Sequence, residues 1–331
     1  MNFRLALSSF FLGILTAFMV WSAQWVLESR REVTFDMPGE VTVLQMFEGP
    51  QIVAAADAMS AQEELKAYLR DRSLALIISS YGEGRPEMLV YDPDGLLSWF
   101  PQPTPEESRS AMSGAYLFEG TYSQRRWSKA TTTPLLPRGV VVEGVIAAPR
   151  GAGNLQYARR IGQDSLPPGN YTINTVDSSQ VGHVLDLLHR MGLAPQGARR
   201  IPLLQYFVLN PLLVVTVLFL VLGHACAVLY WSLYLRGRAH EFGIQSRHGA
   251  HPLALVRENL VGGLPGLVAG GVAGVMFSGL LVAAIGHVQL TPGNFQTLTG
   301  AGVVAAAVAI VTWSTTLYVV IRSRPEVRLL A

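Results

Sequence analysis

The chain has 331 residues, of which 50% are hydrophobic and 15% are charged, with a mean hydropathy of +0.32 and a formal net charge of +2. This composition argues against an ordinary soluble enzyme and favours an integral membrane protein, with length enough for two or three domains. The single cysteine, Cys226, excludes an intrachain disulfide.

Four apolar runs are long enough to cross a bilayer, which requires about 20 mostly apolar residues. The sequence therefore predicts a membrane protein with four transmembrane α-helices and one large α+β extracytoplasmic domain between the first and second helices. The predicted helices are residues 1–27, 203–235, 261–286 and 298–321. The domain covers 28–202, and the other segments are a cytoplasmic loop at 236–260, a short external loop at 287–297 and a cytoplasmic tail at 322–331.

The first apolar run has a second interpretation, a cleaved signal peptide. Charge does not decide between the two, because a three-helix product would keep the same loops inside. The length of the run, the lone Arg4 before it and the poor cleavage site at 21–23 favour a retained helix.

The large domain is predicted to contain strands at 41–47, 74–80, 87–91, 139–147 and 171–175. Two amphipathic helices are expected as well. One begins at a capping box, Ser60 to Glu63, and the other is capped by Ser178 or Ser179. The stretch 101–137 is rich in Pro, Ser, Thr and Gly, and is predicted to be irregular or a mobile insertion.

The arginines outside this domain orient the helices, because basic residues favour the cytoplasmic side. The third-to-fourth loop has none, and the N-terminus, the 236–260 loop and the C-terminus hold Arg4, Arg236, Arg238, Arg247, Arg257, Arg322, Arg324 and Arg328. Both termini are therefore expected in the cytoplasm. Arginine far outnumbers lysine, as in proteins of GC-rich bacteria, so we expect a multi-pass protein of the bacterial cytoplasmic membrane.

No catalytic or cofactor motif is found in the sequence. Neither Lys66 nor Lys129 lies in the Gly-rich turn that a nucleotide-binding loop requires. The loop histidines His240, His248 and His251 could in principle bind a metal, but a solvated or interface role is favoured. We therefore expect a protein that is not an enzyme and binds no cofactor, metal or nucleic acid itself.

The spans contain few polar groups, and their apolar cores hold no Asp, Glu, Lys or Arg. This argues against an ion-coupled relay and against a polar substrate path through the helices. His224 lies deep in the second span, as a functional candidate or as a neutral residue bonded to a neighbouring helix.

Glycines recur every fourth residue in the third span and form a smooth stripe that lets another helix backbone approach closely: Gly262, Gly266, Gly270 and Gly274. The sequence leaves two partners open. One is a neighbouring span of the same chain, and the other is the same helix of a second copy.

The loop RAHEFGIQSRHGAHPLALVREN, residues 238–259, is longer than a simple turn and mixes charges with apolar residues. The second span is expected to continue into the cytosol. A short helix over 242–248 would follow, ended by Gly249, and His251-Pro252 would begin a return helix into the third span. Phe242 and Ile244 are apolar residues that would be exposed unless something covers them.

This loop resembles that of the FtsX/MacB-like permease family, the type VII ABC transporter superfamily. The family has a segment Arg-x-x-Glu-Ile-Gly-Ile/Leu-Arg-x-x-x-Gly-Ala after its second span, and then a helix bearing a Glu. The matching positions here are Arg238, Glu241, Phe242, Gly243, Ile244, Arg247, Gly249, Ala250 and Glu258, with Phe242 for the usual Ile and Gln245 where an Arg is common. The topology of one span, an outer domain and three more spans is also similar to the family's.

The resemblance implies that 236–260 is a coupling segment that docks on a cytoplasmic ABC ATP-binding subunit. Phe242 and Ile244 would enter a groove of that subunit, which would itself bind ATP and Mg. Two permease copies, identical or homologous, would serve an ATPase dimer. ATP binding would then move the outer domain by mechanotransmission, to export or release a hydrophobic or peptide-like substrate.

Two alternatives stand beside this function. The outer domain could instead bind and switch a cell-wall hydrolase, as in FtsX itself, so that its partner is a hydrolase rather than a peptide or lipid. The chain could also be a membrane receptor or scaffold with no ATPase.

Overall fold

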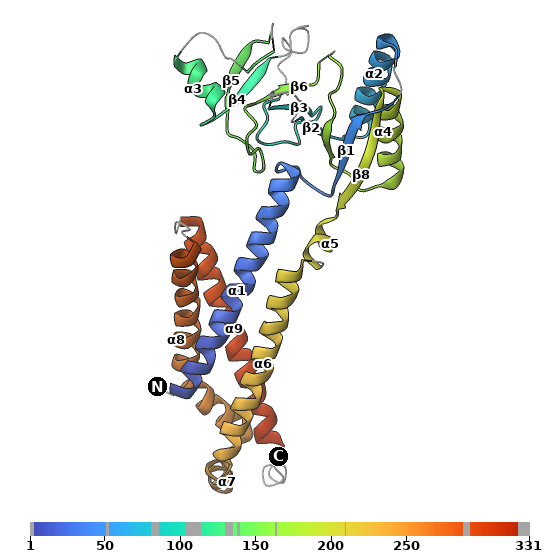
Figure 1. Cartoon of the computed structure of the whole chain (residues 1–331). Helices are drawn as coiled ribbons and strands as arrows, with labels where there is room; N and C mark the ends of the chain where they lie inside the picture. Colours follow the sequence, from blue (N-terminus) through green and yellow to red (C-terminus); the bar gives the residue numbers. More distant parts are fainter. Residues whose placement is uncertain are drawn as a thin grey trace. The chain divides into compact units, whose positions relative to one another are not determined.

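The computed structural model describes residues 3–50, 53–80, 86–102, 114–129, 135–137, 140–162, 164–208, 210–286 and 292–323. The chain forms two compact units, a helical unit of Met1–Val26 with Val208–Ala331 and a sheet domain of Leu27–Phe207. The first helix, α1 (Phe3–Thr34), contributes residues to both units. Figure 1 shows both units and labels most of their elements.

The sheet domain is built on one mixed sheet, whose strand order in the described residues is β5-β4-β6-β3-β2-β7-β1-β8. The strands are β1 (Val41–Glu48), β2 (Leu76–Ser80), β3 (Glu87–Tyr91), β4 (Ala115–Phe118), β5 (Val142–Ile146), β6 (Tyr157–Arg160), β7 (Gly169–Ile173) and β8 (Leu193–Ile201). β3 pairs with β6, and β4 with β5, in parallel, and the other pairs are antiparallel.

Half of this sheet has a ferredoxin-like, split βαβ arrangement. Helix α2 (Ala55–Asp71) connects β1 to β2, and α4 (Ser178–Arg190) connects β7 to β8. The four strands lie in the order β2-β7-β1-β8, all antiparallel to their neighbours. The segment with β3 to β6 is inserted between β2 and β7, and it extends the same sheet beyond β2.

Apolar cores lie on both faces of the sheet. On one face, Leu65 and Leu69 of α2 and Val184 of α4 pack against strand residues such as Ile78 and Tyr171. On the other face, loop residues cover the strands, in a cluster that includes Phe35, Met37, Leu97, Phe100 and Leu155. Alternate residues of β2 thus enter different cores, as the two-residue period of a strand requires.

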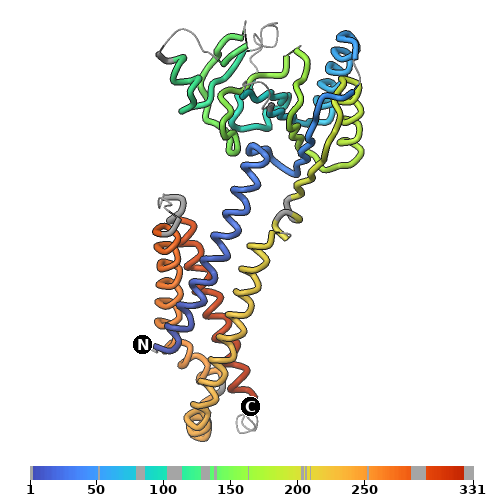
Figure 2. The backbone as a smooth tube through the Cα atoms, in the orientation of Figure 1, coloured from blue at the N-terminus to red at the C-terminus, as the bar shows by residue number. Residues whose placement is uncertain are grey.

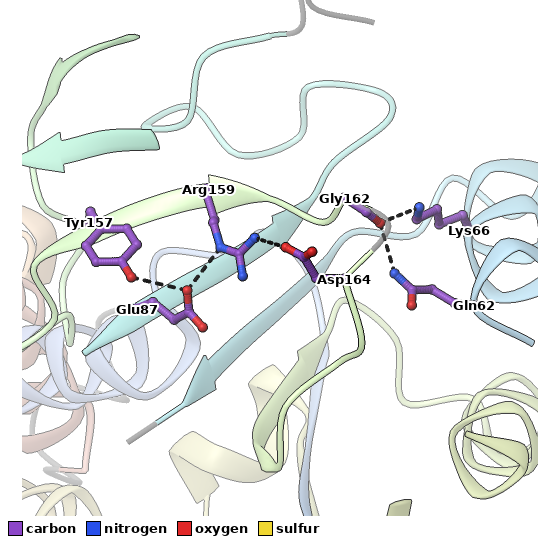
Figure 3. A network of polar contacts seen from close by, with 7 residues as sticks. All are labelled: Gln62, Lys66, Glu87, Tyr157, Arg159, Gly162 and Asp164. Carbon is purple, nitrogen blue, oxygen red and sulfur yellow. Dashed lines mark hydrogen bonds and ion pairs between the residues drawn. The ribbon is translucent and has the colours of Figure 1, made fainter. Parts of the chain in front are cut away.

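A buried ion pair joins neighbouring strands of the domain (Figure 3). Arg159 of β6 donates from Nε to Glu87 Oε2 of β3 at 3.0 Å, and from Nη1 to Asp164 at 2.6 Å. The Tyr157 hydroxyl donates to the same Glu87 oxygen at 3.2 Å. Burial alone would lower the pKa of Arg159, but the hydrogen bond to Asp164 and the charge of Glu87 outweigh it and raise that pKa above its usual value.

Two side chains of α2 bind the backbone just after β6, at the carbonyl oxygen of Gly162. It accepts hydrogen bonds from Lys66 Nζ at 2.7 Å and from Gln62 Nε2 at 2.9 Å (Figure 3). The segment after β6 is therefore held by the sheet on one side and by α2 on the other.

Several predicted details of the domain are corrected. Helix α2 begins at Ala55, so Ser60 lies inside it rather than at a capping box. Helix α4 is capped by Asp177, whose carboxylate accepts from the backbone N–H of Ser179 at 2.9 Å, and not by Ser178 or Ser179. Within the stretch predicted to be irregular, the described residues include β4 and the helix α3 (Tyr122–Lys129).

The helical unit contains α6 (Pro211–Gly237), α7 (Ala239–Arg247), α8 (Pro252–Gly286) and α9 (Pro292–Arg322), together with most of α1. Four helices of the described residues are long and apolar enough to cross a membrane, namely α1, α6, α8 and α9. These four helices fit a multi-pass membrane protein.

The predicted second span is not one helix. A short helix, α5 (Leu203–Val208), ends before Asn210, and α6 begins at Pro211. Asn210 caps α6, since its Oδ1 accepts from the N–H of Leu212 at 3.1 Å, and Pro211 suits the first helical position. Only 6% of the most apolar window of α6 is buried, against 39% in each of the other three helices, so the chain itself covers little of α6.

The glycine stripe of α8 packs against α1 of the same chain. A Cβ on Gly270 would lie 2.1 Å from the carbonyl oxygen of Ala6, and one on Gly274 would lie 2.1 Å from that of Phe10. Gly266 is also buried, whereas Gly262 has no atom within 4 Å of such a Cβ. Of the two partners left open by the sequence, the neighbouring span is the one that contacts Gly270 and Gly274.

An apolar cluster ties the helices together at one end of the unit. It brings Leu5 near the start of α1 together with Leu235 at the end of α6, Leu255 near the start of α8 and Ile321 at the end of α9. The start of α1 and the end of α9 therefore lie at the same end of the helical unit as α7 (Figure 2).

Candidate docking site between α6 and α8

The connection from α6 to α8 is a tight corner that carries the short helix α7. The expected continuation of α6 into the cytosol is wrong beyond Gly237. Arg238 has φ −93° and ψ 7° and separates α6 from α7. Its backbone N–H closes the last turn of α6 by donating to the carbonyl of Leu235 at 3.1 Å.

Arg238 holds the corner together through its side chain. The guanidinium donates from Nε to Glu241 Oε2 at 2.8 Å and from Nη1 to Asn259 Oδ1 of α8 at 3.1 Å. It also lies over the Phe242 ring, 5.6 Å from the centroid. The hydrogen bond to Glu241 raises the pKa of Arg238, so this cation persists at any physiological pH. The corner is thus fixed to both α7 and α8 by one residue.

Phe242 is covered by other residues of its own chain, which identifies the cover that the sequence left open. Only 4% of its surface is accessible, and it belongs to the apolar cluster with Leu235 and Leu255. Ser246, one turn later on the same face of α7, is 2% exposed. Phe242 therefore anchors α7 to the bundle and does not present its ring to a partner in this structure.

The end of α7 is a Schellman motif, which explains the Gly249-Ala250 pair. The N–H of Ala250 donates to the carbonyl of Gln245 at 3.1 Å, and that of Gly249 to the carbonyl of Ser246 at 2.9 Å. Gly249 has φ +86°, a conformation that side-chain-bearing residues avoid. His251 then begins α8, since its Nδ1 accepts from the N–H of Leu253 at 3.3 Å.

The outer surface of the corner is a mixed patch of apolar and charged side chains. Ile244 is 45% exposed and Leu253 is 60% exposed. Glu241, Arg247 and Glu258 of the same segment are exposed as well. Gly243, next to Ile244, is partly buried. A segment that exposes both apolar and charged side chains fits a surface that binds another protein.

Leu253 and Asn259 were not among the residues singled out by the sequence. Leu253 directly follows Pro252 in the first turn of α8. Its exposure could be predicted only if the first residue of that helix was known. Asn259 acts through its contact with Arg238, which no local pattern reveals. Within the described residues, no group of three or more His, Cys, Asp or Glu is placed to hold a metal ion.

When the chain was compared with known proteins, no family model matched it and no curated protein matched it either.

Proposed function

We propose that the chain is the permease subunit of a type VII ABC transporter and that the α6–α8 corner docks on a separate cytoplasmic ATPase subunit. The observation that carries the proposal is the α7 helix, held rigidly between two apolar helices with Ile244 and Leu253 exposed on its corner. A helix fixed in this way can enter a groove of a partner through its exposed apolar residues.

The way α7 is held supports force transfer through this corner. Arg238 bonds to both Glu241 and Asn259, and Phe242 is buried in the cluster that includes Leu235 of α6. A push on α7 would therefore move the end of α6. Little of the apolar part of α6 is buried in the chain, so few contacts oppose its displacement.

The direction of the docking follows from charge. The exposed arginines near the corner, Arg236, Arg247 and Arg257, favour the cytoplasmic side of the membrane. ATP and Mg would be bound by the ATPase subunit, and two permease copies would match an ATPase dimer. The outer sheet domain would then act on a hydrophobic or peptide-like substrate outside the cytoplasmic membrane.

The test is a pull-down of the tagged full chain from its native membrane. We compare wild type with Ile244→Asp, which places a charge on the exposed apolar position without touching the buried Phe242. Met59→Asp is the matched control, because Met59 is 49% exposed on a helix of the sheet domain, against 45% for Ile244.

The proposal predicts a stoichiometric ABC ATPase with wild type and with Met59→Asp, and its loss with Ile244→Asp. Retention of the ATPase by Ile244→Asp would contradict docking through this corner. If the wild-type chain brings down no ATPase in a detergent that keeps membrane complexes intact, the transporter proposal is rejected. A membrane receptor or scaffold is then the remaining function.

A further inference from the structure

A polar cavity lies at the α7 end of the helical unit, among apolar helices. Its volume is about 240 Å³, and its polar lining comes mainly from Arg238, Gln245, Glu258 and Asn259. Tyr234 of α6 adds a further polar side chain, and Leu5 of α1, Gly262 and Gly263 of α8 and Trp313 of α9 complete the wall. A space of this size holds about eight water molecules at about 30 Å³ each, so it is large enough for a small polar group.

Trp313 contributes a buried donor without a partner. The side chain is 2% exposed, and its Nε1 has no hydrogen-bond partner in the described part of the chain. Nε1 lies 3.3 Å from the position of a Cβ on Gly263, so the N–H faces the glycine wall of the cavity. An unpaired buried N–H is unfavourable, so this site favours an occupant with a hydrogen-bond acceptor.

Two opposite charges line the same cavity. Arg238 is already bonded to Glu241 and Asn259, but its guanidinium carries five N–H donors and the cavity borders it. Glu258 forms no ion pair with any other described residue. The cavity therefore offers N–H donors for an anion and a free carboxylate for a cation.

We infer that this cavity binds the phosphoethanolamine headgroup of a membrane phospholipid. The phosphate oxygens accept from Trp313 Nε1 and Arg238, and the primary ammonium donates to Glu258. Arg238 directly follows the apolar helix α6, so the cavity lies at the level where headgroups meet water. This inference rests on the chain lying in a bilayer and does not require the proposed ATPase.

Gly262 in the wall of the cavity allows a test by substitution. Gly262 lines the cavity, and nothing lies within 4 Å of where its Cβ would stand. A leucine at this position therefore adds bulk to the wall of the cavity without a backbone clash. Gly300 of α9 also has nothing within 4 Å and does not line the cavity, so Gly300→Leu is a matched control.

The experiment is native mass spectrometry of the purified full chain, released from nanodiscs that contain equal amounts of phosphatidylethanolamine, phosphatidylglycerol and phosphatidylcholine. Wild type and Gly300→Leu should retain one ethanolamine lipid per chain, with a preference of about tenfold over the other two, as one charge-assisted contact provides. Gly262→Leu should abolish retention. Glu258→Gln should remove the preference over phosphatidylglycerol, and Trp313→Phe should weaken retention of all three lipids.

Equal retention of the three lipids by wild type would overturn the inference, as would retention by Gly262→Leu at the wild-type level. A parallel arm exposes the chain to free phosphoethanolamine in nanodiscs without the ethanolamine lipid. Binding of the free compound by a chain that retains no ethanolamine lipid in the first arm would reject the membrane source. The lipid experiment does not involve the ATPase. Failure of the lipid inference can therefore be distinguished from failure of the proposed docking, which the pull-down tests.

Discussion

Replacing Gly274 by alanine tests how α1 and α8 are held together. A Cβ at this position would lie 2.1 Å from the carbonyl oxygen of Phe10 and 3.1 Å from the backbone nitrogen of Ile14. Both atoms belong to the backbone of α1, so no side-chain rotation relieves the overlap. To reach an ordinary contact of 3.4 Å, the two helices must separate locally by about 1.3 Å.

This separation has a cost that the structure allows us to work out. The Ser9 hydroxyl donates to the carbonyl of Leu267 at 2.6 Å between the same two helices, and a shift of this size would stretch that buried bond. Overpacking of this kind costs about 1–3 kcal/mol. We therefore expect Gly274→Ala to destabilise the chain by that amount and to lower its unfolding midpoint by several degrees.

The matched control is Gly262→Ala in the same helix. Both substitutions gain the same helix propensity, but nothing lies within 4 Å of a Cβ at Gly262. The assay is thermal unfolding of the two purified full-length variants in one detergent, followed by tryptophan fluorescence. Equal midpoints would refute the reasoning and would mean that the stripe does not pack against α1.

Two further predictions concern the sheet domain and use thermal unfolding of the full chain. Arg159→Met should lower the free energy of unfolding by roughly 3–5 kcal/mol, because it leaves Glu87 buried without its cation. The double variant Arg159→Met with Glu87→Leu should recover most of this loss. A double variant no more stable than the single one would contradict the ion-pair argument. Hydrogen bonds from Ser179 lower the pKa of Asp177 below its ordinary value of 3.8, so the stabilisation that they add is present above that value and is lost as the pH falls through the folded-state pKa. The advantage of wild type over Asp177→Asn should therefore be larger at pH 6 than at about pH 3, and a constant difference would refute it.

The apolar helices could be predicted because their signal is local. A run of about 20 apolar residues has few alternatives, and the four predicted segments correspond to α1, α6, α8 and α9. The helix ends were less predictable. Asp177 caps α4 one residue before Ser178, and neighbouring Asp and Ser side chains are equally good caps on sequence alone.

The strands missed by the sequence have weak patterns. β8 contains Pro195 and Gly197, and its register against β1 shifts between Gln45 and Met46, so the usual alternation is broken. β6 is four residues long and includes the buried Arg159, whose partner Glu87 lies on the neighbouring strand β3 but is 72 residues away in the sequence. Such strands depend on tertiary partners that no local window contains.

The docking corner shows the same limit. The sequence indicates a short helix over 242–248 ended by Gly249. In the structure α7 spans Ala239–Arg247, so it begins three residues earlier than predicted, and Gly249 does lie in its C-terminal cap. The exposure of Phe242 could not be read from its neighbours, because the residues that cover it, such as Leu255, come from other helices. The sequence thus predicted where the corner lies, but not which of its side chains are exposed.

The interruption of the helical unit by the sheet domain has a consequence for biosynthesis. Ser9 and its partner Leu267 are 258 residues apart, so at 5–20 residues per second the ribosome needs about 13–50 s to deliver the second after the first. During this interval α1 lacks the glycine stripe that later packs against it. The sheet domain, by contrast, is complete once residue 207 has emerged. We therefore expect the domain to fold first, while a nascent α1 with exposed small residues is the state most open to capture by a membrane chaperone or a quality-control protease.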